Sequence, residues 1–273
     1  MPTRNVTRSI QLHPLTSNWV DRVRLQSGTV PDHKLAAVDQ LVKRLVSLGL
    51  YSDNAASKIQ YLLIFSASSG FTGSNVPLID ISRVGNAVLN NYVAANWSDS
   101  GIAGNESNFY TDTKWSPSLS PMLATGNGHL LIWKTIKAAT TGINGGSNSV
   151  AGGEWTLGRY FGVLEITLHG SASAGDANLN ESFDSIGCHL SSRIGTSLTY
   201  RRDGVLSNNV TVTGVGTICS ISIYLNALND SGTPQHYHSD RIFCNSMGDG
   251  LTANQCSDYF DALSLLQDQL AAI

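Results

Sequence analysis

The stretch Leu198-Thr-Tyr-Arg-Arg-Asp-Gly-Val-Leu206 has the pattern of a β-hairpin. Apolar and polar residues alternate on both sides of Asp203-Gly204, and this dipeptide readily takes the positive φ angles of a tight turn. Clusters of Gly, Asn and Ser recur about every ten residues between roughly 66 and 250, with short apolar runs between them. Many short strands without intervening helices are typical of a sandwich or jelly roll. The sequence therefore predicts a mostly β protein built on an antiparallel β-sandwich.

The individual strands are expected where apolar or alternating runs are bounded by turn residues. They are 76–81, 129–136, 161–169, 185–192, 196–202, 204–213, 217–225 and 239–246. Residues 59–65 form an earlier, mostly apolar run with the length of a buried strand. Residues 140–149 are rich in Gly, Asn and Ser, and we expect a polar loop there.

The clearest N-terminal helix is expected at residues 32–50. Apolar residues recur there at helical spacing on one face, while polar residues, including Lys34 and Asp39, occupy the other. Asp32 is the expected N-cap of this helix and Gly49 its expected C-cap.

A second clear helix is expected at the C-terminal end, from Thr252. Thr252 and Gln255 have the spacing of a capping box. One face carries an apolar stripe formed by Cys256, Tyr259, Phe260, Leu263, Leu266 and Leu270. We expect this helix to pack on the sandwich beside the N-terminal helix.

These elements divide the chain into four parts. We expect an N-terminal arm at 1–18 that orders only against a partner, and a helical attachment segment at 19–65 that leads into the first strand. The sandwich follows at 66–250, and the C-terminal helix at 251–273. A short helix at 18–25 opens the attachment segment.

Charge and cysteine content exclude several classes of protein. Charged residues make up 14% of the chain and the net charge is −3, so the basic surface that binds nucleic acid is not expected. The sequence has neither a signal-peptide pattern nor an apolar run of transmembrane length, and we expect assembly in a cytoplasm without membrane insertion. The cysteines, which we expect to be buried, lack the spacing of a zinc site, and a disulfide among them is left open. They are Cys188, Cys219, Cys244 and Cys256.

One short stretch, Gln235-His-Tyr-His-Ser-Asp240, has a metal-like pattern. His236 and His238 would share one face of a strand, and Asp240 would add a third ligand. The stretch falls in an expected loop before a late strand, which favours a polar loop. We therefore expect neither a metal nor another cofactor.

Catalysis by a glycoside hydrolase would need two carboxylates that face each other across a cleft. Glu165 stands alone on its expected strand, and Glu154 lies in a glycine-rich stretch. Glu181 and Asp184 fall in an expected loop. Because none of these acids forms an alternating acidic cluster, we do not expect an enzyme.

Sugar binding without catalysis would use exposed aromatic rings with polar neighbours. Trp97, Trp115 and Trp155 lie in polar, loop-like contexts and are the candidate glycan-binding residues. Trp133 lies in an apolar strand and is expected in the core.

Four stretches, taken in chain order, carry a further signal. They are 19–30 with 37–51 and 59–65; Asn108-Phe-Tyr-Thr-Asp-Thr113; Thr199-Tyr-Arg-Arg-Asp-Gly-Val205; and 226–234 with 241–244 and 250–255, leading into the last helix. In this order they resemble a family of structural proteins of tailed bacteriophages and prophages. Its members carry a laminin-G-like, concanavalin A-like jelly roll with a small helical N-terminal part.

This resemblance implies a virion structural protein: a head, neck or tail accessory protein, a fibre or a capsid decoration protein. Such a protein acts by assembly with other virion proteins, as a homo-oligomer on a symmetric platform. Laminin-G domains also hold calcium at the sandwich rim, for which Asp176, Asp184 and Asp230 are candidate ligands. Two alternatives stay open: a receptor-binding lectin-like module for host surface glycans, and a glycoside hydrolase of the concanavalin-like fold.

Overall fold

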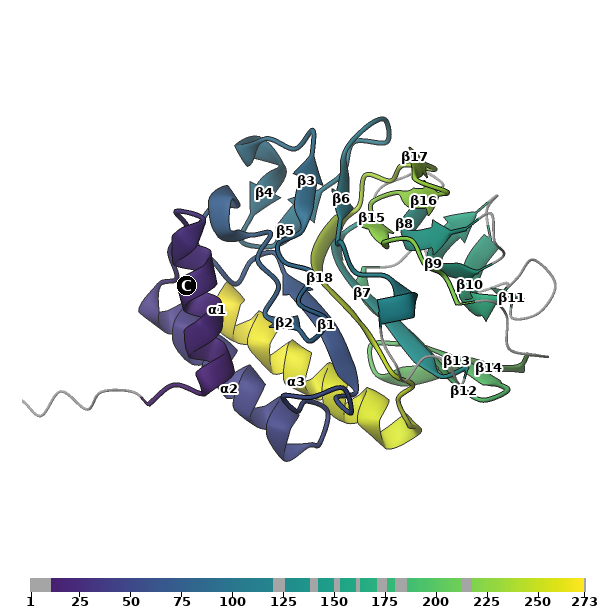
Figure 1. The fold of residues 1–273 in the computed structure, drawn as a ribbon, viewed down its shortest axis with the longest axis horizontal. Helices are drawn as coiled ribbons and strands as arrows, with labels where there is room; N and C mark the ends of the chain where they lie inside the picture. The colour runs from purple at the N-terminus through teal and green to yellow at the C-terminus, as the bar shows by residue number, and fades with distance from the viewer. Residues whose placement is uncertain are drawn as a thin grey trace, which may run out of the picture.

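The fold was analysed in a computed structural model. The structure describes residues 11–119, 126–137, 142–149, 153–160, 163–170, 176–179, 186–212 and 218–272, and for 159–160, 163–170 and 176–179 only the backbone. Two sheets face each other, and helices cover the outer face of one of them (Figure 1). The protein is therefore mostly β, and the predicted β-sandwich with N-terminal helices and a C-terminal helix is confirmed.

The first sheet is antiparallel and lies between the helices and the second sheet. Its order is β14 (Val205–Thr211), β13 (Ser197–Arg202), β12 (Gly187–Ile194), β7 (Gly128–Ile136), β18 (Arg241–Gly248), β1 (Ile59–Ile64) and β2 (Ile79–Asp80). Two short strands extend it, since β5 (Gly101–Ala103) pairs with β18 and β4 (Trp97–Ser98) pairs with β5.

The second sheet runs in the order β11 (Asp176–Leu179), β10 (Val163–Gly170), β9 (Glu154–Tyr160), β8 (Gly142–Asn148), β15 (Tyr224–Leu225), β6 (Tyr110–Asp112) and β3 (Val88–Asn90). β16 (Leu228–Asp230) pairs with β8 in parallel and with β17 (Thr233–Gln235) in antiparallel fashion. Short 3-10 helices lie at Phe71–Gly73, Ala94–Asn96 and Pro117–Leu119.

The side chains of β7 alternate between the two faces of the first sheet, so this strand contributes to two hydrophobic cores. Leu131 and Trp133 point to the helices, whereas Leu130 and Ile132 point to the second sheet. Successive side chains of a strand face opposite sides, so a strand between two apolar layers carries apolar residues on both. Trp133 is buried, as predicted, and stacks on Phe260 with 5.6 Å between ring centroids.

The helical layer consists of α1 (Pro14–Leu25), α2 (Asp32–Ser47) and α3 (Ala253–Ala271). α1 begins before the expected helix at 18–25, so the predicted arm at 1–18 is wrong for residues 14–18. Pro14 suits the first helical turn because its fixed φ is helical and the first N–H groups need no partner within the helix. The His13 side chain accepts a hydrogen bond from the Leu15 amide, which makes His13 the N-cap. Among the described residues, no helix is both long and apolar enough to cross a membrane.

Both predicted caps of α2 are wrong by one residue, since its C-cap is Leu48 and not Gly49. Pro31, not Asp32, is the N-cap of α2. At its other end Gly49 takes a φ of +67°, and the amides of Gly49 and Leu50 donate to the carbonyls of Val46 and Leu45. This is the Schellman ending that a glycine favours.

The capping box of α3 is present. The Thr252 side chain accepts from the Gln255 amide, and the Gln255 side chain accepts from the Thr252 amide. The predicted apolar stripe faces the first sheet, with Phe260 only partly buried. α3 also lies beside α2, where the side chains of Gln269 and Gln40 are hydrogen-bonded.

The strand predictions fail where the strands are only two residues long or where the sequence is rich in glycine. The Asp203-Gly204 hairpin is confirmed, with φ angles of 51° and 76° at these two residues. Only Ile79–Asp80 of 76–81 is a strand, and only Tyr224–Leu225 within 218–225. The predicted loop at 140–149 is wrong because 142–148 form β8. A Cβ atom on Gly146 would lie 2.8 Å from the Trp155 carbonyl oxygen, so close packing explains this glycine in a strand.

Candidate functional site

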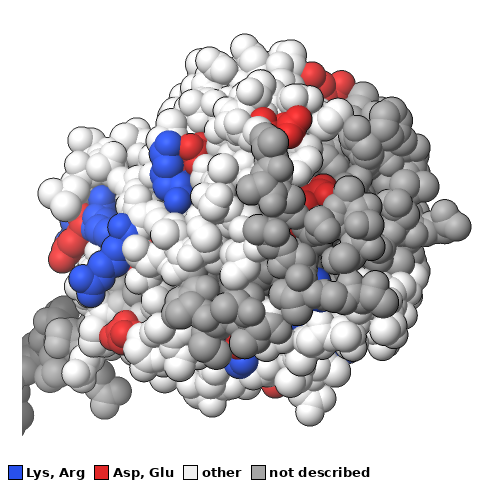
Figure 2. Space-filling view, turned by 45° about the vertical axis from the view of Figure 1, so that its right-hand side comes forward, with Lys and Arg blue, Asp and Glu red and all other residues white. Residues whose placement is uncertain are grey.

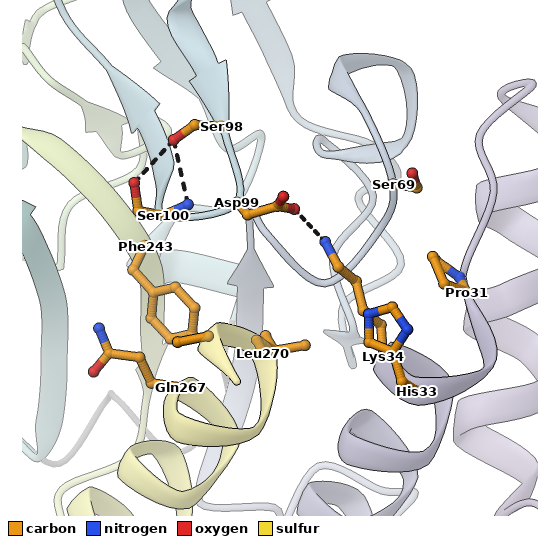
Figure 3. A pocket seen from close by; sticks show the side chains of 11 residues that line it. Pro31, His33, Lys34, Ser69, Ser98, Asp99, Ser100, Phe243, Gln267 and Leu270 are labelled. Carbon is orange, nitrogen blue, oxygen red and sulfur yellow. Dashed lines mark hydrogen bonds and ion pairs between the residues drawn. The ribbon is translucent and has the colours of Figure 1, made fainter. Parts of the chain in front are cut away.

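A cleft of about 610 Å³ lies where the helical layer meets the edge of the first sheet. The start of α2, the end of α3 and the turn between β4 and β5 form its walls (Figure 3). Its lining comprises Pro31, His33, Lys34, Ser69, Ser98, Asp99, Ser100, Phe243, Gln267, Leu270 and Ala271. Phe243 and Leu270 are buried and apolar, and the rest of the wall is largely polar.

Lys34 is the central side chain of this cleft. Its Nζ donates to the carbonyls of Ser66 at 3.0 Å and Ser68 at 3.2 Å, and it pairs with Asp99 Oδ1 at 2.5 Å (Figure 3). The Lys34 side chain is 6% exposed and that of Asp99 68% exposed. The prediction that Lys34 lies on the exposed polar face of its helix was therefore wrong. A buried ammonium is stable only when it is paired and hydrogen-bonded, and these three partners meet that need.

Trp97 stands beside this lysine. The Nζ of Lys34 is 5.7 Å from the centroid of the Trp97 ring, within the range of a cation–π contact. The indole N–H donates to the Phe65 carbonyl at 2.7 Å. Trp97 is half-buried and is the only one of the three predicted tryptophans with an appreciable exposed surface.

Trp115 and Trp155 are wrong as glycan-binding candidates in this structure. Each has 0% of its surface exposed, and their ring centroids are 5.8 Å apart in the core between the sheets. A ring without exposed surface cannot stack on a sugar. Polar neighbours of both residues, such as Thr113 and Thr156, are themselves buried, so a polar sequence around a tryptophan does not indicate an exposed ring here.

The metal-like stretch 235–240 places its three candidate side chains in different environments. His236 is exposed, whereas His238 and Asp240 are buried. Asp240 accepts from Asn144 Nδ2 at 2.8 Å and pairs with Lys134 Nζ at 3.2 Å. Within the described part of the chain, no group of three His, Cys, Asp or Glu residues could hold a metal ion.

The predicted acids for hydrolysis and for calcium receive little support. The side chains of Glu165 and Asp176 lie outside the described residues, as do Glu181 and Asp184. Asp230 accepts a hydrogen bond from the Gln235 side chain at 3.0 Å. The hydrolase alternative is therefore not tested, and neither is the possibility of calcium at the sandwich rim.

Most lysines of the protein are paired with aspartates. Of the six lysines in the sequence, five form such pairs: Lys34–Asp99, Lys43–Asp39, Lys58–Asp249, Lys114–Asp112 and Lys134–Asp240. The molecular face in Figure 2 shows only scattered charges among uncharged residues. The charges of these residues are thus satisfied within the fold, and the described part of the face in Figure 2 is largely uncharged.

A smaller cleft of about 450 Å³ lies between α1 and the turn after β2. Two charged side chains that line it, Arg22 and Asp80, are hydrogen-bonded to the backbone of the protein. Arg22 donates to the Pro77 carbonyl at 2.6 Å, and burial lowers the pKa of its guanidinium while nearby Asp80 opposes that shift. Asp80 accepts from the amides of Val84 and Gly85.

The four cysteines are buried and free, as expected for small apolar residues. Burial raises the pKa of the Cys256 thiol to about 11 and that of Cys188 well above its ordinary value. Such thiols stay protonated at neutral pH and are poor nucleophiles.

Comparison with known proteins supports the fold alone. No protein-family model matches the sequence, and no curated protein matches it. The receptor-binding domain of botulinum neurotoxin C/D mosaic serotype is similar in structure, with a TM-score of 0.51, 9% identity, and coverage of 75% of this chain and 51% of that one. Trypanosoma rangeli sialidase in complex with 2,3-difluoro-KDN has a TM-score of 0.50 and 13% identity, over 85% of this chain and 39% of the sialidase chain. This chain thus spans about two fifths of the sialidase and half of the toxin domain.

Lys34 and Asp99, the centre of the larger cleft, were not identified from the sequence. A signal for Lys34 was present, because it is spaced from Val38, Leu41 and Leu45 as one stripe of α2. Asp99 gave no such signal, since only the tertiary fold brings the β4–β5 turn to the helix.

Proposed function

We propose that this protein is a non-catalytic structural protein of a bacteriophage virion. Its N-terminal segment and helical layer would join it to a head, neck or tail partner, and the sandwich would project from that attachment. The resemblance of the helical segment, the hairpin and the last helix to phage structural proteins supports this assignment.

The observation that carries the proposal is the one-sided helical layer. α1, α2 and α3 share a core with the outer face of the first sheet, separate from the core between the sheets. The layer also exposes apolar side chains, with Leu25 80% and Val46 42% exposed. These two side chains are the positions at which attachment through the helical layer can be tested.

The neutral surface supports attachment rather than catalysis. The lysine–aspartate pairs leave few charges to steer a partner, so binding would depend on shape and apolar contact. The cleft beside Lys34 combines an apolar base with serine hydroxyls and could accept a partner side chain at the same interface.

The proposal is tested by incorporation into particles. Particles are induced from a lysogen that encodes the protein, purified by density, and probed for the wild-type chain and for the double variant Leu25→Lys/Val46→Lys. The matched control is Val88→Lys, because Val88 is 41% exposed on β3 of the second sheet, which carries no helices. We expect the double variant to be lost from particles while it remains folded, and the control to be incorporated normally. Absence of the wild-type chain from the particles would contradict the proposal.

A further inference from the structure

The outer face of the second sheet carries a cluster of three tyrosines. The ring centroids of Tyr110 and Tyr224 are 4.6 Å apart, and those of Tyr110 and Tyr237 are 6.3 Å apart. Tyr110 and Tyr237 are half-buried, and Tyr224 is 7% exposed. These rings lie on the side of the second sheet that has no helices, and none of them belongs to either hydrophobic core. Packing in the cores therefore does not account for them.

Strand register places two of these rings on the outer face. Tyr224 on β15 pairs with Asp112 on β6, and the next pair, Leu225 with Thr111, is buried between the sheets. By the alternation of strand side chains, Tyr110 and Tyr224 therefore point outward.

The third ring is fixed by the backbone on both sides of it. The carbonyl of His236 accepts from the Ile143 amide at 3.0 Å, and the His238 amide donates to the Asn226 carbonyl at 2.9 Å. A Cβ atom on Gly142 would lie 2.6 Å from the Tyr237 carbonyl oxygen, so the glycine lets this segment approach β8. The backbone of Tyr237 is thus held against the sheet on both sides of the residue, and its ring lies beside that of Tyr110.

The polar groups around the rings are neutral in sum. Asp112 lies beside Tyr224 and pairs with Lys114 Nζ at 2.6 Å. Burial, with Asp112 next in effect, raises the pKa of the Tyr224 hydroxyl to about 12. The hydroxyl therefore stays a neutral hydrogen-bond donor at physiological pH.

We propose that Tyr110 and Tyr237, with the buried Tyr224 packed against Tyr110, form a binding site for a neutral saccharide. A pyranose has an apolar C–H face that packs on aromatic rings, and its hydroxyl groups can bond to the tyrosine O–H groups and to Lys114. An acidic sugar would gain little, because Lys114 is already neutralised by Asp112. The planes of Tyr110 and Tyr237 are inclined by 59°, so the two rings can contact successive sugar units, and weak contacts of this kind add up along a polysaccharide. This inference goes beyond the virion assignment and does not depend on it.

Titration of the purified full-length protein with a defined panel tests this site. The neutral probes are maltoheptaose, cellohexaose, xylohexaose and chitohexaose, the acidic probe is sialyllactose, and a proline-rich peptide represents a protein ligand. Binding is followed by chemical-shift changes and saturation transfer at probe concentrations up to about 10 mM, the range of weak single-site affinities. We expect at least one neutral probe to bind, and to bind more tightly than sialyllactose or the peptide.

Two variants connect that binding to the tyrosines. Tyr237→Ala should weaken it about tenfold or more, whereas Tyr237→Phe, which keeps the ring, should retain most of it. Both variants are first checked for an unchanged unfolding midpoint, and Tyr110→Ala replaces Tyr237→Ala if the latter is unfolded. Failure of every neutral probe, preference for the peptide, or equal binding by the alanine variant would overturn the inference. Loss of virion incorporation would leave these in vitro results unaffected, so the two proposals fail separately.

Discussion

The ammonium of Lys134 lies 3.2 Å from Asp240 Oδ2, with 2% and 1% of the two side chains exposed. Lys134 belongs to the first sheet and Asn144, which donates to the same carboxylate at 2.8 Å, belongs to the second. Asp240 therefore connects the two sheets within the sandwich. Removing one partner of a buried pair leaves an uncompensated charge, which is costly.

Replacing this lysine should destabilise the protein strongly. We expect Lys134→Met to lower the free energy of unfolding by about 3–5 kcal/mol. Adding Asp240→Asn should recover part of the loss, because the buried charge is then gone and an acceptor for Asn144 remains. The control Lys114→Met affects a pair whose lysine side chain is 45% exposed, and should cost less than about 1 kcal/mol. Urea unfolding measures all three, and equal losses for both lysines would contradict the prediction.

The stability of the protein should fall as the pH drops from about 6.5 to 4. His129 is buried, its Nδ1 is 2.7 Å from the Asp249 carbonyl oxygen, and burial lowers its pKa from 6.5 to about 4. As the pH falls, His129 is protonated in the unfolded chain before it is protonated in the folded protein. The stability that neutral His129 contributes is therefore fully present above pH 6.5 and is lost as the pH approaches 4. Its size is on the order of 3 kcal/mol.

Two histidine variants isolate this effect. Unfolding free energies measured across that pH window should depend less steeply on pH in His129→Asn, whatever its absolute stability. His33→Asn, at an exposed position, should keep the wild-type slope. An unchanged slope in His129→Asn would show that other groups cause the pH dependence.

Gly158 should resist even a single added methyl group. A Cβ atom there would lie 2.7 Å from Ile143 Cα and 2.8 Å from the Asn144 amide nitrogen, both in the backbone of the paired strand. We expect Gly158→Ala to cost about 1–3 kcal/mol. At Gly145 the first obstacle is the mobile end of the Ile132 side chain, so Gly145→Ala should cost less. Thermal unfolding of both variants checks this order, and the reverse order would be inconsistent with the packing of β8.

Lys34 should hold the helical layer to the sandwich. Lys34→Met leaves the carbonyls of Ser66 and Ser68 without this donor, and we expect a loss of about 1–3 kcal/mol. His33→Ala, at an exposed position of the same cleft, should change stability by less than about 0.5 kcal/mol. Hydrogen exchange should accelerate in α2 more than in β7. Uniform acceleration in both elements would mean that the lysine supports the whole fold instead.

The sequence predicted best those elements whose signal is local. The Asp203-Gly204 turn and the capping box of Thr252 and Gln255 depend on neighbouring residues, and both are present. β8 was missed because its glycines are required by close packing against neighbouring strands, and a local sequence pattern does not reveal such contacts. Trp115 and Trp155 were misjudged for a related reason, since each stands alone among polar residues and meets the other only in the folded core.

The candidate binding surfaces could be predicted less well than the local elements, because tertiary structure brings their residues together. Tyr110, Tyr224 and Tyr237 are far apart in the chain, and the pairing of β15 with β6 brings two of them together. Strand β15 is only two residues long, so its side-chain alternation could not be read in advance. Lys34 could have been assigned to the buried stripe by its spacing, but its partners come from two turns that are distant in the sequence, the one after β1 and the one between β4 and β5.

A cryo-EM map of purified phage particles from a host that encodes this protein tests the central claim most directly. The account predicts density for the sandwich in symmetric copies on the head, neck or tail, with α1, α2 and α3 toward the particle and the second sheet outward. Density in which the second sheet faces the particle and the helices face solvent would contradict the attachment geometry. Absence of the chain from the particle would contradict the structural role itself.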